Sequence, residues 1–131
     1  MRASVRRQMR IGRTAEQVWE LVGDPSRISE WFDGIESATV EGSTRTVLTA
    51  SGMSMPETIV TNDSLQRRFQ YRIDTALFRE HLSTIDVFDL GDGTSLVSYA
   101  ADADPAVMAL VIAGAAGAAL RHLREILEGE R

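Results

Sequence analysis

The sequence contains no cysteine and no lysine, and it has only two histidines, His81 and His122. Without cysteine, disulfides, thiolate nucleophiles and Cys-ligated zinc are excluded. Without lysine, Schiff-base chemistry is excluded, and all 14 basic residues are arginine. Two histidines are too few for a histidine-rich metal site, so we expect neither a metal nor a cofactor.

Positive charge is also in deficit, because the net charge is −5 and the pI is about 5.0. This balance argues against nucleic acid and anionic membrane surfaces as partners. Arginines do gather near the start of the chain, at Arg2, Arg6, Arg7, Arg10 and Arg13. Their alternation on a predicted edge strand favours a solvated face over a nucleic-acid patch. The sequence also lacks a P-loop and a dinucleotide-binding fingerprint.

The length and composition predict one soluble domain over residues 1–131. Hydrophobic residues make up 44% of the chain and charged residues 25%, which is typical of a globular protein rather than a disordered one. No apolar run lies near the N-terminus, so we expect no signal peptide and a cytoplasmic location. Residues 106–120 are uncharged, but 15 residues fall short of the roughly 20 that cross a bilayer. We expect a buried or half-buried helix there and no stable membrane insertion.

The order of the predicted elements indicates an α+β domain. Apolar and polar residues alternate over residues 5–11, as in a strand, and Thr14 with Gln17 forms a capping box for a short helix. Asp24 and Pro25 predict the start of a second short helix, and Asp104 with Pro105 that of a long final one. Turn residues delimit six more strands, at residues 36–41, 44–50, 56–61, 67–74, 80–89 and 94–101.

The final helix is unusual because small residues fill its middle, residues 113–119. Glycine within a helix costs about 1 kcal/mol relative to alanine, and close approach to a sheet, or room for a ligand, would offset that cost. A sheet bent around this helix would leave a hollow suited to a small apolar molecule. The predicted inward stripe consists of Met108, Val111, Ile112, Ala115, Ala119, His122, Leu123 and Ile126.

Several segments, in this order along the chain, carry a resemblance to a known family: residues 11–22, Asp24, Pro25, Trp31, residues 40–45, Glu57, residues 62–63, residues 67–73, residues 91–95 and Tyr99. With them the sequence resembles the START-like (SRPBCC, or helix-grip) superfamily, and within it the polyketide cyclase/dehydrase type. The resemblance implies a seven-stranded antiparallel sheet curved around a long C-terminal helix, with two short helices between strands 1 and 2. It also implies an apolar cavity between the sheet and that helix. Function varies widely in this superfamily, which includes lipid carriers, hormone receptors and aromatase/cyclases.

Arg45 and Glu57 are the first candidates for chemistry. They lie on successive strands, and a hairpin centred near residues 51–52 brings them close to opposite each other. The resemblance implies that both point inward, where a charged pair would orient a carboxylate, hydroxyl or carbonyl of the ligand. An ion pair at the cavity rim, or plain solvent exposure, is the alternative that the residues leave open.

Tyr71, His81 and Ser83 are the other polar candidates. The Tyr71 phenol, between Phe69 and Ile73 on one strand face, would bond a ligand oxygen or satisfy its own hydroxyl at the core edge. His81 and Ser83 share a face that the resemblance turns inward. Histidine titrates near neutral pH, so His81 would shuttle a proton with Glu57, unless its role is structural.

These arguments predict a set of cavity residues and three classes of function. Glu57, His81 and Tyr71 are the catalytic candidates, and Trp31 is either a cavity lid or, as we favour, core. The leading function is binding of a small hydrophobic or amphipathic ligand; the alternatives are a cyclase/dehydrase-like enzyme acting on a polyketide-like ligand and a ligand-free homodimer. The predicted cavity residues are Trp31, Arg45, Glu57, Ile59, Tyr71, His81, Ser83, Met108 and Ile112.

Overall fold

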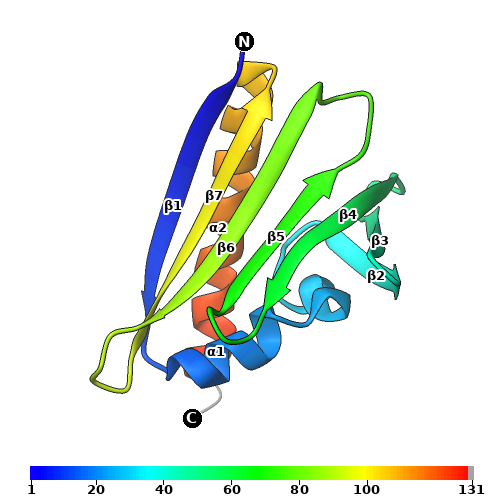
Figure 1. The fold of residues 1–131 in the computed structure, drawn as a ribbon. Coiled ribbons are helices and arrows are strands. Elements are labelled where there is room, and N and C mark those ends of the chain that lie inside the picture. The colour runs from blue at the N-terminus through cyan, green and yellow to red at the C-terminus, as the bar shows by residue number, and fades with distance from the viewer. Residues whose placement is uncertain (130–131) are drawn as a thin grey trace.

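Seven antiparallel strands form one sheet in the computed structural model, which describes residues 1–129. The sheet curves around the long helix α2, and β1 and β2 are its edges (Figure 1). This arrangement confirms the predicted helix-grip fold. The elements are β1 (Ala3–Ile11), α1 (Ala15–Val22), η1 (Pro25–Glu30), β2 (Ile35–Glu41), β3 (Thr44–Thr49), β4 (Ser54–Asp63), β5 (Arg68–Ile73), β6 (Glu80–Asp89), β7 (Ser95–Asp104) and α2 (Ala106–Gly129).

The two short helices between β1 and β2 are present, but the second is of a different type from the one predicted. The capping box of α1 forms as expected, with the Thr14 side chain accepting from the Gln17 amide. Asp24 caps η1 through a hydrogen bond from the Ser26 amide, yet η1 is a 3₁₀ helix that ends at Glu30. Such short helices commonly serve as connectors, and this one brings the chain from α1 to β2.

The start of α2 also differs from the prediction. Asp104, the predicted N-cap, is the last residue of β7, and α2 begins at Ala106. The Asp104 backbone carbonyl accepts from the Arg79 amide, and its side chain binds the N-terminal ammonium of Met1. Its hydrogen-bonding groups are therefore used to join β7 to its neighbours.

Two faces of α2 have different partners. The buried face packs against β1 and β7 and consists of Ala109, Ala113, Ala116, Ala119, Leu120, Leu123 and Leu127. Its alanines let the helix lie close to the sheet. Much of the predicted inward stripe lies outside this buried face: Met108, Val111 and Ile112 line a cavity. The helix is long and apolar enough to cross a membrane by length and composition, but here it is the core helix of a soluble fold.

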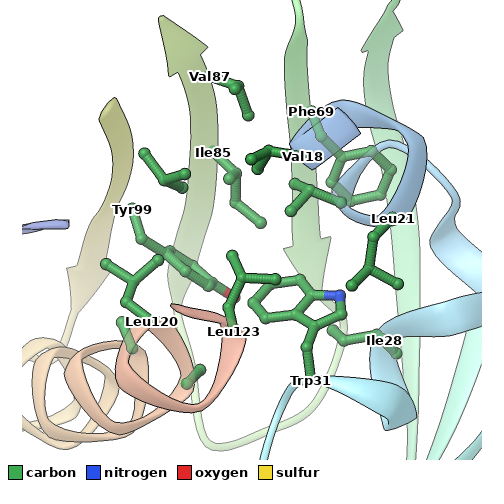
Figure 2. Packing of buried hydrophobic residues seen from close by; sticks show 14 of the residues in the cluster. Val18, Leu21, Ile28, Trp31, Phe69, Ile85, Val87, Tyr99, Leu120 and Leu123 are labelled. Atoms are coloured by element: carbon green, nitrogen blue, oxygen red, sulfur yellow. The ribbon is translucent and has the colours of Figure 1, made fainter. Parts of the chain in front are cut away.

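The core is centred on Trp31, which is 2% exposed. Figure 2 shows its indole ring among side chains from α1, from the sheet and from α2. The ring lies 6.2 Å from the ring of Tyr99 and 6.0 Å from that of Phe32, both in tilted geometry. Contacts of this kind add to the free energy gained by burying aromatic area. Trp31 is thus a core residue, as favoured from the sequence, and does not line the cavity.

Candidate functional site

An apolar cavity of about 300 Å³ lies between α2, η1 and the concave face of the sheet. That volume is at the lower end of the range for small-molecule sites, about 300–1,000 Å³. Its walls are aliphatic, aromatic and thioether side chains, and polar groups are few. The lining residues are Ile28, Phe32, Asp33, Gly34, Ile35, Thr49, Ser51, Met53, Met55, Glu57, Tyr71, Ile73, Leu77, Phe78, Tyr99, Met108, Val111, Ile112 and Ala115.

A buried ion pair supplies one polar group of the cavity wall. Arg45 and Glu57 are directly opposite in the β3–β4 ladder, as the hairpin argument predicted, and are 2% and 3% exposed. The Arg45 Nε donates to Glu57 Oε1 at 2.7 Å. Burial raises the pKa of the Glu57 carboxyl, and the charge of Arg45 opposes that shift. Glu57 lines the cavity.

Arg45 lies on the side of this pair that is away from the cavity. Its Nη1 donates to the backbone carbonyl of Pro25 at 3.2 Å, and its guanidinium lies 4.8 Å from the Tyr71 ring centre and 5.2 Å from that of Phe69. These contacts place it behind Glu57 and outside the cavity lining. Within this pair, Glu57 lines the cavity and Arg45 does not. Arg45 instead holds the carboxylate in position.

Two phenols supply further polar groups, and Asp33, Thr49 and Ser51 are also in the lining. Tyr71 and Tyr99 both line the cavity, and their hydroxyls are hydrogen-bonded to each other. Burial raises the pKa of both phenols, and the charge of Glu57 raises them further, so both are protonated at neutral pH. Tyr99 is not among the predicted cavity residues, although it alternates with Val97 and Ala101 on the buried face of β7.

His81 is buried and engaged through both ring nitrogens. Its Nδ1 accepts from the Ile73 amide at 2.8 Å, so its Nε2 carries the proton and donates to Ser83 Oγ, also at 2.8 Å. Burial lowers its pKa to about 4, with Asp74 and Asp102 acting in the opposite direction. His81 is therefore neutral at pH 7. Neither His81 nor Ser83 lines the cavity, so a direct exchange of protons between His81 and Glu57 has no contact to support it.

Four of the nine predicted cavity residues line the cavity: Glu57, Tyr71, Met108 and Ile112. Ile59 packs at the edge of the core, and Trp31, Arg45, His81 and Ser83 are buried outside the lining.

The lining also includes residues that the sequence argument missed. Met53 and Met55 alternate with Ser54 and precede Glu57 on the same face of the strand, and this period of two is the signal that would have found them. Methionine side chains adapt to ligands of irregular shape.

The second histidine is not in the lining, but it contacts a residue that is. His122 Nδ1 lies 2.9 Å from Asp33 Oδ1, and both side chains are more than a third exposed. Within residues 1–129, no group of three or more histidine, aspartate or glutamate side chains is arranged to hold a metal ion.

Comparisons with solved structures agree with this fold. The protein XoxI from Bacillus cereus is 26% identical, with a TM-score of 0.90 over 98% of this chain and 99% of that one. A norcoclaurine synthase point mutant from Thalictrum flavum, in complex with a transition-state analogue, is 14% identical, with a TM-score of 0.79 over 100% of this chain and 98% of that one. The di-domain ARO/CYC protein BexL, from the BE-7585A biosynthetic pathway, is 15% identical, with a TM-score of 0.83 over 96% of this chain and 46% of that one.

The structures under 25% identity support the fold alone. A search of the curated proteins finds no match to the sequence. The family model described as "Polyketide cyclase / dehydrase and lipid transport" matches residues 2–128, which is nearly the whole chain. The resemblance carried by the sequence motifs is thereby confirmed, and the chain belongs to this polyketide cyclase/dehydrase and lipid transport family within the START-like superfamily.

Proposed function

We propose that this protein binds a small, largely apolar ligand in the cavity between the sheet and α2. The observation that carries the proposal is the cavity itself: about 300 Å³, walled by apolar side chains, with Glu57, Tyr71 and Tyr99 as polar groups in its wall. A few polar groups in an apolar pocket fix the orientation of a ligand, while the walls supply most of the affinity. The family description, which includes lipid transport, supports the same function.

Filling the cavity is expected to abolish binding. Ile112→Trp would place an indole among the lining residues, and we expect the affinity for the neutral fluorophore N-phenyl-1-naphthylamine to fall at least tenfold, or about 1.4 kcal/mol. The matched control is Leu65→Trp, because Leu65 is 91% exposed and lies outside the cavity. Fluorescence titration measures both affinities, and native mass spectrometry of freshly purified protein shows whether a ligand co-purifies. Equal binding by the two variants, or no binding by the wild type, would contradict the proposal.

A cyclase/dehydrase-like enzyme is the second candidate, and one observation favours it. The Glu57 carboxylate faces the cavity beside two phenols, so a base and hydrogen-bond donors converge on one space. Glu57 would remove a proton next to a carbonyl while a phenol stabilises the developing oxyanion. Tyr71 and Glu57 are the catalytic candidates in contact with the cavity. His81 would act only through Ser83.

This second candidate predicts a loss of turnover in Glu57→Gln. We expect turnover of a poly-β-keto model substrate to fall at least about 100-fold, which is the lower end of the usual effect of a general base. Asp33→Asn is the matched control, since Asp33 also lines the cavity but its side chain is 65% exposed. Circular dichroism verifies that both variants fold. Unchanged turnover in a folded Glu57→Gln variant would remove Glu57 from the mechanism.

The homodimer remains a third proposal. Val107 and Leu110 on α2 are 61% and 69% exposed, and an exposed apolar helix face can serve as an association surface. A monomer in light scattering at high protein concentration would contradict this proposal. A dimer that Leu110→Glu dissociates would support it.

A further inference from the structure

The two phenols present one free hydrogen to the cavity. Tyr71 and Tyr99 have two hydroxyl hydrogens between them, and the bond that joins them uses one. In either direction of that bond, the second hydrogen is left for another acceptor. Both rings line the cavity, so a ligand oxygen there would receive a hydrogen bond from this pair.

A chain of hydrogen bonds lies next to the phenols, on the side of β6. The Ile73 amide donates to His81 Nδ1, which leaves His81 Nε2 to donate to Ser83 Oγ. Ser83 lies opposite Tyr71 in the β5–β6 ladder, at the end of this chain. The chain starts at a backbone amide, which can only donate, so both of its hydrogen bonds point toward Ser83. Ser83 Oγ thus already accepts one hydrogen from His81, while the phenol pair adjoins the cavity.

The acceptor nearest the Arg45 guanidinium in the cavity wall is the carboxylate of Glu57, and its second oxygen is available. Oε1 accepts from Arg45 Nε, and no donor within residues 1–129 reaches Oε2. Some buried side-chain polar atoms have no hydrogen-bond partner, and Arg45 Nη2 is one of them. Glu57 Oε2 is not in that group. Glu57 lines the cavity, so Oε2 is the acceptor that its carboxylate has left for a ligand.

The charge at this site is balanced within the protein. Arg45 and Glu57 neutralise each other at 2.7 Å, and Arg45 has no contact with the cavity. A carboxylate or phosphate ligand would face Glu57 with a second negative charge, and no arginine or histidine within residues 1–129 lines the cavity. An ammonium ligand would satisfy Oε2, but it has no acceptor site for the phenol hydrogen.

We propose, on the basis of the binding function above, that the cavity selects a neutral ligand group that both donates and accepts a hydrogen bond, namely a hydroxyl of an alcohol, phenol or enol. Its hydrogen would bond to Glu57 Oε2, and its oxygen would accept from the Tyr71–Tyr99 pair. The rest of the ligand would be apolar and would occupy the space beside Met108 and Ile112.

A matched set of bicyclic probes tests this selection on the wild-type protein. The set comprises 2-naphthol, which donates and accepts; 2-methoxynaphthalene, which only accepts; naphthalene, which does neither; and 2-naphthoate, which is anionic. Competition with N-phenyl-1-naphthylamine at pH 7 gives their relative affinities. We expect 2-naphthol to bind about tenfold more tightly than 2-methoxynaphthalene, since each net hydrogen bond contributes about 0.5–1.5 kcal/mol. We expect 2-naphthoate to bind most weakly.

The outcomes separate this inference from the proposed function. Equal affinities for the neutral probes, or a preference for 2-naphthoate, would overturn the hydroxyl selection and leave apolar binding intact. No binding by any probe would overturn both. The variant Tyr71→Phe/Tyr99→Phe removes both hydroxyls while retaining the ring volumes. We expect it to keep its affinity for naphthalene and lose the preference for 2-naphthol, whereas a merely structural role of the phenols would weaken all neutral probes together.

Discussion

Replacing Arg45 by methionine is expected to destabilise the folded protein by about 3–5 kcal/mol. This is the usual cost of removing one partner of a buried ion pair, because the remaining charge is left without compensation. Arg45 and Glu57 are both almost fully buried, and their side chains are joined at 2.7 Å. Methionine retains much of the apolar stem of arginine, so loss of packing contributes less. Urea unfolding at pH 7, followed by circular dichroism, measures the change in the free energy of unfolding.

The double variant Arg45→Met/Glu57→Gln is the matched control. It removes both charges, and replacing a whole buried pair with neutral groups is often close to neutral for stability. We therefore expect it to recover most of the stability that the single variant loses. If the double variant is as unstable as Arg45→Met alone, packing of the guanidinium on Phe69 and Tyr71 is the dominant effect, and the ion-pair explanation fails.

His81 is expected to make the protein less stable as the pH falls from about 6.5 to about 4. Its folded-state pKa is lowered to about 4, and its ordinary value is 6.5. Over this window the unfolded chain binds a proton that the folded protein does not, so the free energy of unfolding rises with pH. The difference amounts to about 3 kcal/mol between pH 4 and pH 7. In His81→Gln, where the amide can still accept from Ile73 and donate to Ser83, we expect this dependence to disappear.

The comparison between variants separates the contribution of His81 to the pH dependence of stability from the contributions of other titrating groups. The raised pKa of Glu57 acts in the opposite direction, because stability from a carboxyl of raised pKa is lost as the pH rises through its folded-state value. That contribution is common to the wild type and to His81→Gln, so it cancels in the difference. His122→Gln is the control, since His122 is a partly exposed surface residue. An identical pH dependence in the wild type and His81→Gln would contradict the burial of a neutral His81.

The pairing of Arg45 with Glu57 was predictable because a hairpin is a local structure. Once the turn is placed near residues 51–52, counting outward along both strands brings the two residues opposite each other. The β3–β4 register pairs them in this way. The strand order and the long final helix follow in the same way from alternation, turn residues and the family motifs. The capping box at Thr14 was equally visible, because its two residues are three apart in the chain.

The direction of a side chain was not predictable where it depends on residues that are distant in the sequence. Arg45 lies behind Glu57 because the carbonyl of Pro25 and the rings of Phe69 and Tyr71 surround its guanidinium, and these belong to other elements. His81 is oriented by a backbone amide that no pattern of side chains reveals. The helical period of α2 found four residues of the cavity lining but only two of the seven buried residues, Ala119 and Leu123. It could not say which face meets the sheet and which meets the cavity.

The division of α2 into two faces has a consequence for how proteins of this fold diverge. One face, built from alanine and leucine, holds the helix on β1 and β7, while Met108, Val111 and Ile112 shape the cavity. Substitutions at these three positions alter the volume of the cavity, whereas the contact with the sheet is made by other residues. Cavity shape and helix packing therefore depend on separate sets of positions on one helix, so the cavity can change by a few substitutions while the fold is retained.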